Sequence, residues 1–420
     1  MTNSKPYYLN FLKEKKNYEY FDNLKFELDK RVYHYGEQFK TNNENRDTVI
    51  NFLKKEFRIL KAILDCRKNA TNFKNVAINN AYFGLIDELK AQNFTPLKVP
   101  WISSYNKIGL YFDLLRYEKF LSKTTFDDLI EEDSFNFYSE IKNKLLYYYS
   151  NKNIKILSIY NDTCTYERMS IDIFKELNKP SFIFLHGLPG RYNIIDENRS
   201  DYLIVWGKKI KENYIKNGFD ENKIIISGHP NYKFYNLSKI NIKMSFDNIL
   251  ILSKGANSFP QGNSVQLADR GNLILYLLEI EEVLKKKNIK HVTFRPHPSE
   301  NINWYYKFIS KDFFRPDATK DINKSINKSS LVIGPRSTSF INSLMNNINY
   351  IVYDPLDYEN LDFINSQQVP PFDKTDERLV VCNSKDELLE NLSKFSIVNK
   401  EILHDYIEPN FNLNFLNKYI

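Results

Sequence analysis

Glycine, cysteine and long apolar runs are all scarce in this sequence. It has 12 glycines in 420 residues, so a glycine-rich phosphate loop is not expected to dominate any site. Its cysteines are three, odd in number and far apart, which excludes a disulfide framework and a zinc-binding spacing and fits a reducing cytoplasm. No stretch of about 18 apolar residues occurs, and the first residues lack the apolar core of a signal peptide. Any contact with a membrane is therefore expected to be peripheral.

Charge is nearly balanced. The sequence carries 59 basic and 52 acidic residues, a formal net charge of +7. This mild excess fits a solvated mixed-charge surface, or an attraction to anionic substrates or an anionic membrane face. No dense basic block with interleaved aromatic residues is present, so nucleic acid is not an expected partner. An apolar share of 42% is ample for packed cores.

Short apolar strands alternate with helical patterns from residue 75 onward. This rhythm predicts parallel sheets that are covered by helices on both faces. The rhythm breaks over residues 229–246 and then restarts, so we expect two doubly wound, Rossmann-like α/β domains facing a central cleft. The predicted segments are a helical N-terminal extension (1–70), an N-terminal Rossmann-like domain (71–240), a C-terminal Rossmann-like domain (241–400) and a C-terminal tail (401–420).

Ligands of doubly wound sheets bind beyond the carboxyl ends of the strands, so the residues that follow each strand are the candidates for chemistry. In the first domain, His186 follows the strand Ser181–Leu185 and can act as a general base near neutral pH. Asp162 follows the strand Ile154–Tyr160, and Glu167 lies at the start of the next helix. Asp162 is expected to face the same cleft, although it could instead cap that helix.

In the second domain, the most specific signal is the sequence Arg295-Pro296-His297-Pro298. The prolines fix the backbone around His297, and Arg295 lies beside it, so this turn suits a phosphate ligand. After an earlier strand come Lys254 and Gly255, which also suit a phosphate or an acidic sugar, although an ordinary polar loop would look the same.

A hydroxyl-rich turn follows the strand Ser330–Ile333. It contains Arg336, Ser337, Thr338 and Ser339 and opens a helix, so its hydroxyls and free N–H groups predict an anion site as well as a helix cap. Arg336 could add a bidentate contact. A second His-Pro pair, at His229, ends the last strand of the first domain, and we interpret it as structural rather than catalytic.

These motifs resemble those of bacterial GT-B glycosyltransferases. FRPHPSE (294–300), followed by GPRSTS (334–339), is similar to the His-Pro and Ser/Thr motifs of bacterial sialyltransferases and polysialyltransferases. The resemblance implies that His297 and Ser337 or Thr338 contact the phosphate of a CMP-sugar donor, and that the backbone near Pro298 contacts the cytosine.

The first half resembles capsule and teichoic-acid enzymes. FLHGLPGRYN (184–193), SDYLIVWG (200–207) and IIISGHPNYKFY (224–235) are similar to segments of CDP-glycerol glycerophosphotransferases and Kdo-type capsule transferases. This likeness implies that His186 is a base or a transition-state contact. The acidic pair followed by glycine, which supplies the base in the sialyltransferases, has no counterpart here, so Asp162 and Glu167 remain candidates beside His186.

The expected activity is an inverting, metal-independent transfer of sialic acid or another nonulosonic acid from a CMP donor to a bacterial surface glycan. Neither a cofactor nor a metal is expected, since protein groups can stabilise the departing phosphate and no Asp-x-Asp lies in a strand-end loop. The cytoplasm, or the cytoplasmic face of the inner membrane, is the expected location. The alternatives are a CDP-glycerol or CDP-ribitol phosphotransferase, a Kdo transferase, a UDP-sugar transferase or 2-epimerase, and a silent nucleotide-sugar-binding scaffold subunit.

Overall fold

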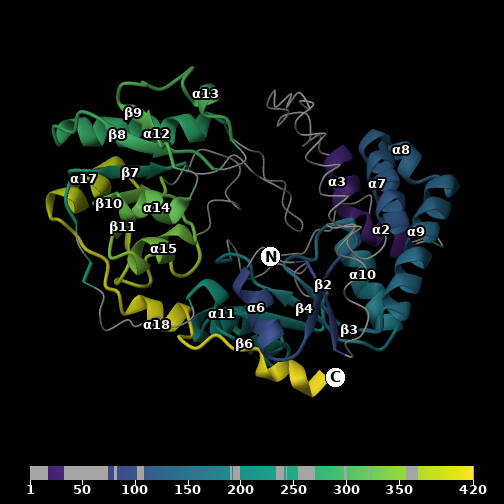
Figure 1. The fold of residues 1–420 in the computed structure, drawn as a ribbon. Helices are drawn as coiled ribbons and strands as arrows, with labels where there is room; N and C mark the ends of the chain where they lie inside the picture. Colours follow the sequence, from purple (N-terminus) through teal and green to yellow (C-terminus); the bar gives the residue numbers. More distant parts are fainter. Residues whose placement is uncertain are drawn as a thin grey trace.

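The structure, a computed structural model, has two sheet domains joined side by side (Figure 1). It describes twelve stretches of the chain, and of the predicted helical N-terminal extension (1–70) only residues 18–32 lie within them. The described residues are 18–32, 74–79, 83–101, 108–189, 192, 199–232, 241–242, 244–253, 270–297, 300–319, 321–355 and 368–419.

The first domain is built on a six-stranded parallel sheet with the order β2-β1-β3-β4-β5-β6. Strand order reverses between β1 and β3. In doubly wound folds, ligands bind beyond the carboxyl ends of the strands at such a reversal. Its strands are β1 (Asn75–Ile78), β2 (Thr95–Lys98), β3 (Ile154–Ile159), β4 (Ser181–Phe184), β5 (Tyr202–Val205) and β6 (Ile224–Ile226).

The second domain has another six-stranded parallel sheet, with the order β12-β11-β10-β7-β8-β9. This is the Rossmann order, with its reversal between β7 and β10. The two sheets confirm the predicted fold class, GT-B with two doubly wound domains. The strands are β7 (Ile249–Leu252), β8 (Val292–Arg295), β9 (Phe314–Pro316), β10 (Leu331–Gly334), β11 (Asn349–Tyr353) and β12 (Val380–Cys382).

Helices connect the strands, and asparagines end many of them. Asparagine tolerates the left-handed conformation that ends a helix, because its short polar side chain can bond locally. In the first domain the helices are α6 (Phe83–Ala91), α7 (Ile108–Lys123), α8 (Phe126–Leu129), α9 (Glu132–Asn151), α10 (Thr165–Glu176) and α11 (Lys208–Lys216). In the second they are α12 (Arg270–Lys286), α13 (Ile302–Tyr305), α14 (Ile322–Asn327), α15 (Ser339–Met345) and α17 (Lys385–Ser393). The asparagines with positive φ just after helices are Asn93, Asn153, Asn178, Asn288 and Asn347.

The N-terminal helices α2 (Tyr18–Asn23) and α3 (Lys25–Val32) pack beside α7, α8 and α10 of the first domain (Figure 1). Among the described residues, no helix is both long and apolar enough to cross a bilayer.

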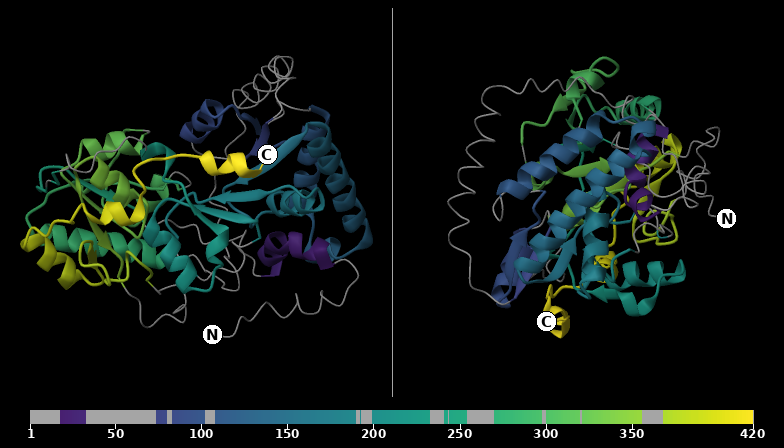
Figure 2. Two further views of the ribbon diagram at one scale, coloured as in Figure 1. Left: turned by 90° about the horizontal axis from the view of Figure 1, so that it is seen from below. Right: turned by 90° about the vertical axis from the view of Figure 1, so that its right-hand side faces the viewer.

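The C-terminal residues return to the first domain (Figures 1 and 2). Helix α18 (Ile402–Tyr406) packs on α11, and the Glu408 N–H donates to the Trp206 carbonyl at 2.7 Å. A Cβ on Gly207 would collide with the backbone of Tyr406, so only glycine allows this close approach. The predicted C-terminal tail (401–420) therefore packs against the first domain.

Two edge strands of the second sheet, β9 and β12, were not predicted. Each has three residues, and β9 ends in Pro316, so neither carries enough alternation to be read as a strand. Strand β2 begins at Thr95 and contains Pro96, which is accommodated because β2 lies at the edge of its sheet.

Candidate functional site

His186 lies two residues beyond β4, at the carboxyl edge of the first sheet, and its side chain is exposed. Its Nδ1 lies 2.9 Å from the carbonyl oxygen of Tyr160, which follows the neighbouring strand β3. A carbonyl can only accept, so Nδ1 carries the proton and the neutral ring has its lone pair on Nε2. This contact therefore selects the Nδ1–H tautomer of the neutral imidazole.

Asp162 follows β3 as predicted, but it is fully buried instead of being presented in the cleft. Its Oδ2 accepts the Arg199 N–H at 3.1 Å. The Arg199 guanidinium in turn pairs with Asp22 and donates to Asn23, both on α2. Asp162 and α2 together anchor the point at which the segment after His186 returns to the sheet.

Glu167, on α10, is buried next to Asn79, the residue that follows β1. The Asn79 amide, which follows β1, donates to its Oε1 at 2.6 Å. Burial raises the pKa of Glu167 to about 7, although hydrogen bonds, including those from Asn79 and Trp101, act in the opposite direction. A carboxyl of this kind can hold a proton near neutral pH, but its burial keeps it from direct contact with a substrate.

The turn after β8 is fixed by hydrogen bonds to Ser253, which follows the neighbouring strand β7, and to Glu300. The His297 N–H donates to the Ser253 hydroxyl at 2.8 Å and to Glu300 Oε2 at 2.9 Å, and Ser253 itself donates to Glu300 at 2.6 Å. The His297 side chain is exposed above this turn. Glu300 lies three residues after His297, and no local sequence pattern indicates its bond to the His297 N–H.

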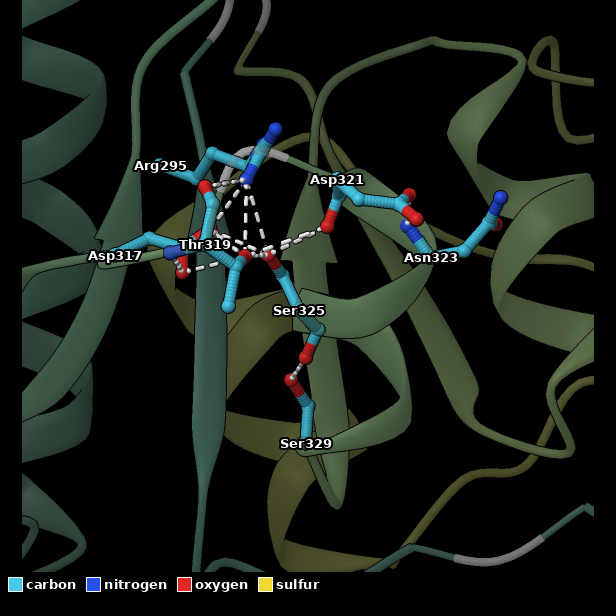
Figure 3. Close-up of polar contacts among 7 residues, drawn as sticks. All are labelled: Arg295, Asp317, Thr319, Asp321, Asn323, Ser325 and Ser329. Carbon is cyan, nitrogen blue, oxygen red and sulfur yellow. Dashed lines mark hydrogen bonds and ion pairs between the residues drawn. The ribbon is translucent and has the colours of Figure 1, made fainter.

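Arg295 lies in a polar cluster that joins β8, β9 and α14 (Figure 3). Its Nη1 forms an ion pair with Asp317 at 2.5 Å and donates to the Ser325 hydroxyl at 3.0 Å and the Thr319 carbonyl at 2.9 Å. Burial alone would raise the pKa of Asp317, but hydrogen bonds from Ser325, Thr319 and Arg295 outweigh it and hold that pKa below its usual value. Arg295 thus joins the elements of its own domain. The contact with a donor phosphate that we predicted for it stays a prediction.

The hydroxyl-rich turn lies at the reversal of strand order in the second sheet, between β10 and α15. Ser337 Oγ accepts the Ser339 N–H at 3.2 Å and so caps the first turn, while Thr338 makes no cap bond within its own helix. Arg336 pairs with the buried Asp354 at 2.7 Å.

The two domains meet at the two turns that the sequence singled out. The Leu188 N–H, from the loop that carries His186, donates to Thr338 Oγ1 at 2.9 Å. Gly187 is so close that a Cβ there would lie 3.4 Å from the same hydroxyl. The structure therefore brings His186, Ser337 and Thr338 to one interdomain position, with His297 two strands away from that turn on the same sheet edge. Lys254, Gly255 and Pro298 lie outside the described residues.

No protein-family model matches the sequence, and no curated protein matches it. Among solved structures, the chain is similar to a UDP-GlcNAc 2-epimerase of Methanocaldococcus jannaschii, with 12% identity and a TM-score of 0.49 over 83% of this chain and 99% of that one. It is also similar to a UDP-GlcNAc 2-epimerase of Neisseria meningitidis, with 11% identity and a TM-score of 0.47 over 82% of this chain and 97% of that one. The wall teichoic acid polymerase TagF gives 11% identity and a TM-score of 0.42 over 88% and 96%.

Proposed function

We propose that this chain is an inverting glycosyltransferase that moves sialic acid or another nonulosonic acid from a CMP donor to a hydroxyl of a bacterial surface glycan. The observation that carries the proposal is the contact between Leu188 and Thr338. It joins the loop of the candidate base to the hydroxyls proposed for the donor phosphate, although 150 residues separate the two in sequence. Transfer requires these two groups on opposite sides of one reacting carbon.

His186 is the proposed base. Its Nδ1 lies 2.9 Å from the Tyr160 carbonyl, and in this proposal Nε2 takes the proton of the acceptor hydroxyl. The two other candidates are less suited, since Asp162 is 0% exposed and Glu167 is 4% exposed. In this proposal Asp162 anchors the loop, and the acceptor glycan binds over the first domain.

His297, Ser337 and Thr338 are proposed to stabilise the departing phosphate. The acceptor oxygen forms a bond to the anomeric carbon while the bond from that carbon to the phosphate oxygen breaks. CMP leaves with the bonding electrons, and the acceptor proton passes to His186. Negative charge grows on the leaving phosphate, where preorganised donors lower the barrier most. Protein groups supply this stabilisation, so we propose that the transfer needs no metal.

The nearest alternative is a CDP-glycerol or CDP-ribitol phosphotransferase, which the missing acidic-Gly motif favours. The two reactions differ in where phosphorus goes. Sugar transfer from a CMP-nonulosonic acid leaves the only phosphate on the nucleotide, whereas phosphotransfer adds a phosphate to the acceptor product.

Phosphorus NMR of the products separates these reactions. The full-length protein is incubated with CMP-sialate, CMP-Kdo, CDP-glycerol or UDP-GlcNAc and a glycan acceptor. We expect CMP to be released from a CMP-sugar and no phosphorus to enter the glycan. Phosphorus in the glycan would establish phosphotransfer, and binding of a nucleotide without turnover would favour a scaffold subunit. If no CMP donor binds or reacts, the proposal fails.

A further inference from the structure

The second His-Pro pair follows β6: His229 lies three residues beyond the strand, and Pro230 begins a short 3-10 helix (Pro230–Tyr232). His229 is 2% exposed. The edge of the Trp206 indole meets its ring, with centroids 4.5 Å apart at 83°, and the Tyr232 ring lies 4.4 Å away at 30°. These three residues, the aromatic stack, form one packed block.

His229 is a neutral member of this stack. Its Nδ1 accepts the Asn231 N–H at 3.1 Å, so the ring proton resides on Nε2. Burial lowers the pKa of His229 to about 3. A residue held neutral and enclosed in this way is unsuited to proton transfer with a substrate in the cleft.

The two ends of the aromatic stack form hydrogen bonds with different domains. Trp206 Nε1 donates to the carbonyl of Leu185, the residue before His186, at 2.8 Å. At the other end, the Tyr232 hydroxyl donates to Asn342 Oδ1 on α15 at 2.8 Å. The Asn342 amide then donates to Asn323 on α14 at 3.0 Å. A continuous set of contacts therefore runs from the strand end that carries His186 to the helices of the second domain.

Helix α15 thus meets the first domain at two points. Thr338, at its start, accepts the Leu188 N–H, and Asn342 accepts the Tyr232 hydroxyl one turn later. A single hydrogen bond would constrain the distance between α15 and the first domain at one point, but not the angle between them. Two contacts one turn apart, backed by a rigid aromatic block, define the orientation of α15 relative to β4.

We propose that Trp206, His229 and Tyr232 form a positioning unit that sets the placement of His186 relative to the Ser337–Thr338 turn. His229 is accordingly a positioning residue. The effect on rate rests on the proposed function, whereas the effect on the Leu188 contact does not. Misplacing reacting groups by about 1 Å can cost as much as a hundredfold in rate, so a unit that fixes their relative position contributes to catalysis without touching the substrate.

Amide exchange at Leu188 tests the positioning unit in the ligand-free, full-length protein. Tyr232→Phe keeps the ring and removes only the hydroxyl that bonds Asn342. We expect Leu188 exchange to accelerate roughly three- to tenfold, the size of one lost hydrogen bond. The matched control is Tyr306→Phe, which removes a hydroxyl bonded to the Phe314 carbonyl within the second domain. Unchanged Leu188 exchange in Tyr232→Phe, or equal acceleration in the control, would overturn the proposal.

Two substitutions of His229 separate stacking from hydrogen bonding. His229→Phe keeps a ring between Trp206 and Tyr232, and His229→Asn keeps an acceptor for the Asn231 N–H. If stacking is what positions the unit, amide exchange at Leu188 should stay as slow as in the parent in His229→Phe and become faster in His229→Asn. The reverse result would contradict this role. With an active donor, Tyr232→Phe should lower kcat and leave the donor KM unchanged. If the exchange results hold but no donor is turned over, the proposed function fails and the positioning unit stands.

Discussion

The N–H of Leu188 donates to the hydroxyl of Thr338 at 2.9 Å, across the boundary between the two domains. One residue belongs to the loop after β4 and the other to the turn before α15. A threonine hydroxyl can accept this bond and still donate its own proton to a phosphate. In the proposed function, Thr338 therefore links a bound donor to the loop that carries His186.

Replacing Thr338 tests this link. Thr338→Val removes the acceptor with little change in volume and should lower the transfer rate about tenfold, while Thr338→Ser should stay within about twofold of the parent, because an unpaired N–H costs roughly 1–3 kcal/mol. Steady-state kinetics with the CMP donor measures both. Equal rates for the valine and serine variants would show that the hydroxyl plays no part.

The identity of the base can be tested by comparing two strand-end residues. His186→Ala should lower the rate with bound donor by about 10²- to 10⁴-fold and leave donor affinity unchanged, since general bases contribute that much. Asp162→Asn keeps an oxygen for the Arg199 N–H and should keep most of the activity. Single-turnover rates at saturating donor distinguish them. A severe loss in Asp162→Asn with near-normal rates in His186→Ala would reverse the assignment.

Glu167 should make stability depend on pH. Its folded pKa, about 7, lies above the unfolded value of 4.5, so the folded state keeps a proton that the unfolded chain releases between these values. Stability is then lost as pH rises through that window, by about 3 kcal/mol in total. Urea unfolding at pH 5 and pH 8 measures this effect. Between these pH values, the free energy of unfolding of the parent should fall by about 3 kcal/mol more than that of Glu167→Gln. Glu132→Gln, at an exposed site on α9, is the control. A constant difference between Glu167→Gln and the parent would contradict the raised pKa.

Gly334 is expected to admit no side chain. A Cβ at this position would overlap the hydroxyl of Tyr350, which itself donates to the Pro335 carbonyl at 2.8 Å. Gly334→Ala should therefore lower the free energy of unfolding by about 1–3 kcal/mol, as overpacking does. Adding Tyr350→Phe removes the nearest atom and should restore part of the loss. If the double variant is as unstable as the sum of the two single changes, the clash is not the cause.

The sequence predicted most of the fold because the interior strands are short, wholly apolar and separated by helices, as in NILIL and YLIVW. It missed β9 and β12, which lie at the edges of the second sheet and have three residues each. Edge strands need less apolar character and less length, so their pattern is weak.

The predictions for the site were limited by side-chain partners that are distant in sequence. Strand-end position singled out the loop of His186 and the turn of Thr338, because ligands of doubly wound sheets bind beyond the carboxyl ends of the strands. The two segments belong to different sheets, and the bond from Leu188 to Thr338 joins them. The ion pair of Arg295 with Asp317 and the burial of Asp162 depend on tertiary packing, which no local pattern encodes. The aromatic stack around His229 has the same origin, since Trp206 and Tyr232 meet only in the folded chain.

Direct binding of CMP to the parent and to His297→Ala tests the central claim, that the turn after β8 holds the donor phosphate. Isothermal titration is made on the full-length protein, with His186→Ala as a control on the other side of the cleft. We predict that CMP binds the parent and His186→Ala with similar affinity, and binds His297→Ala at least about tenfold more weakly, the loss of one charge-assisted hydrogen bond. Equal affinity in all three proteins, or no CMP binding to the parent, would contradict the account.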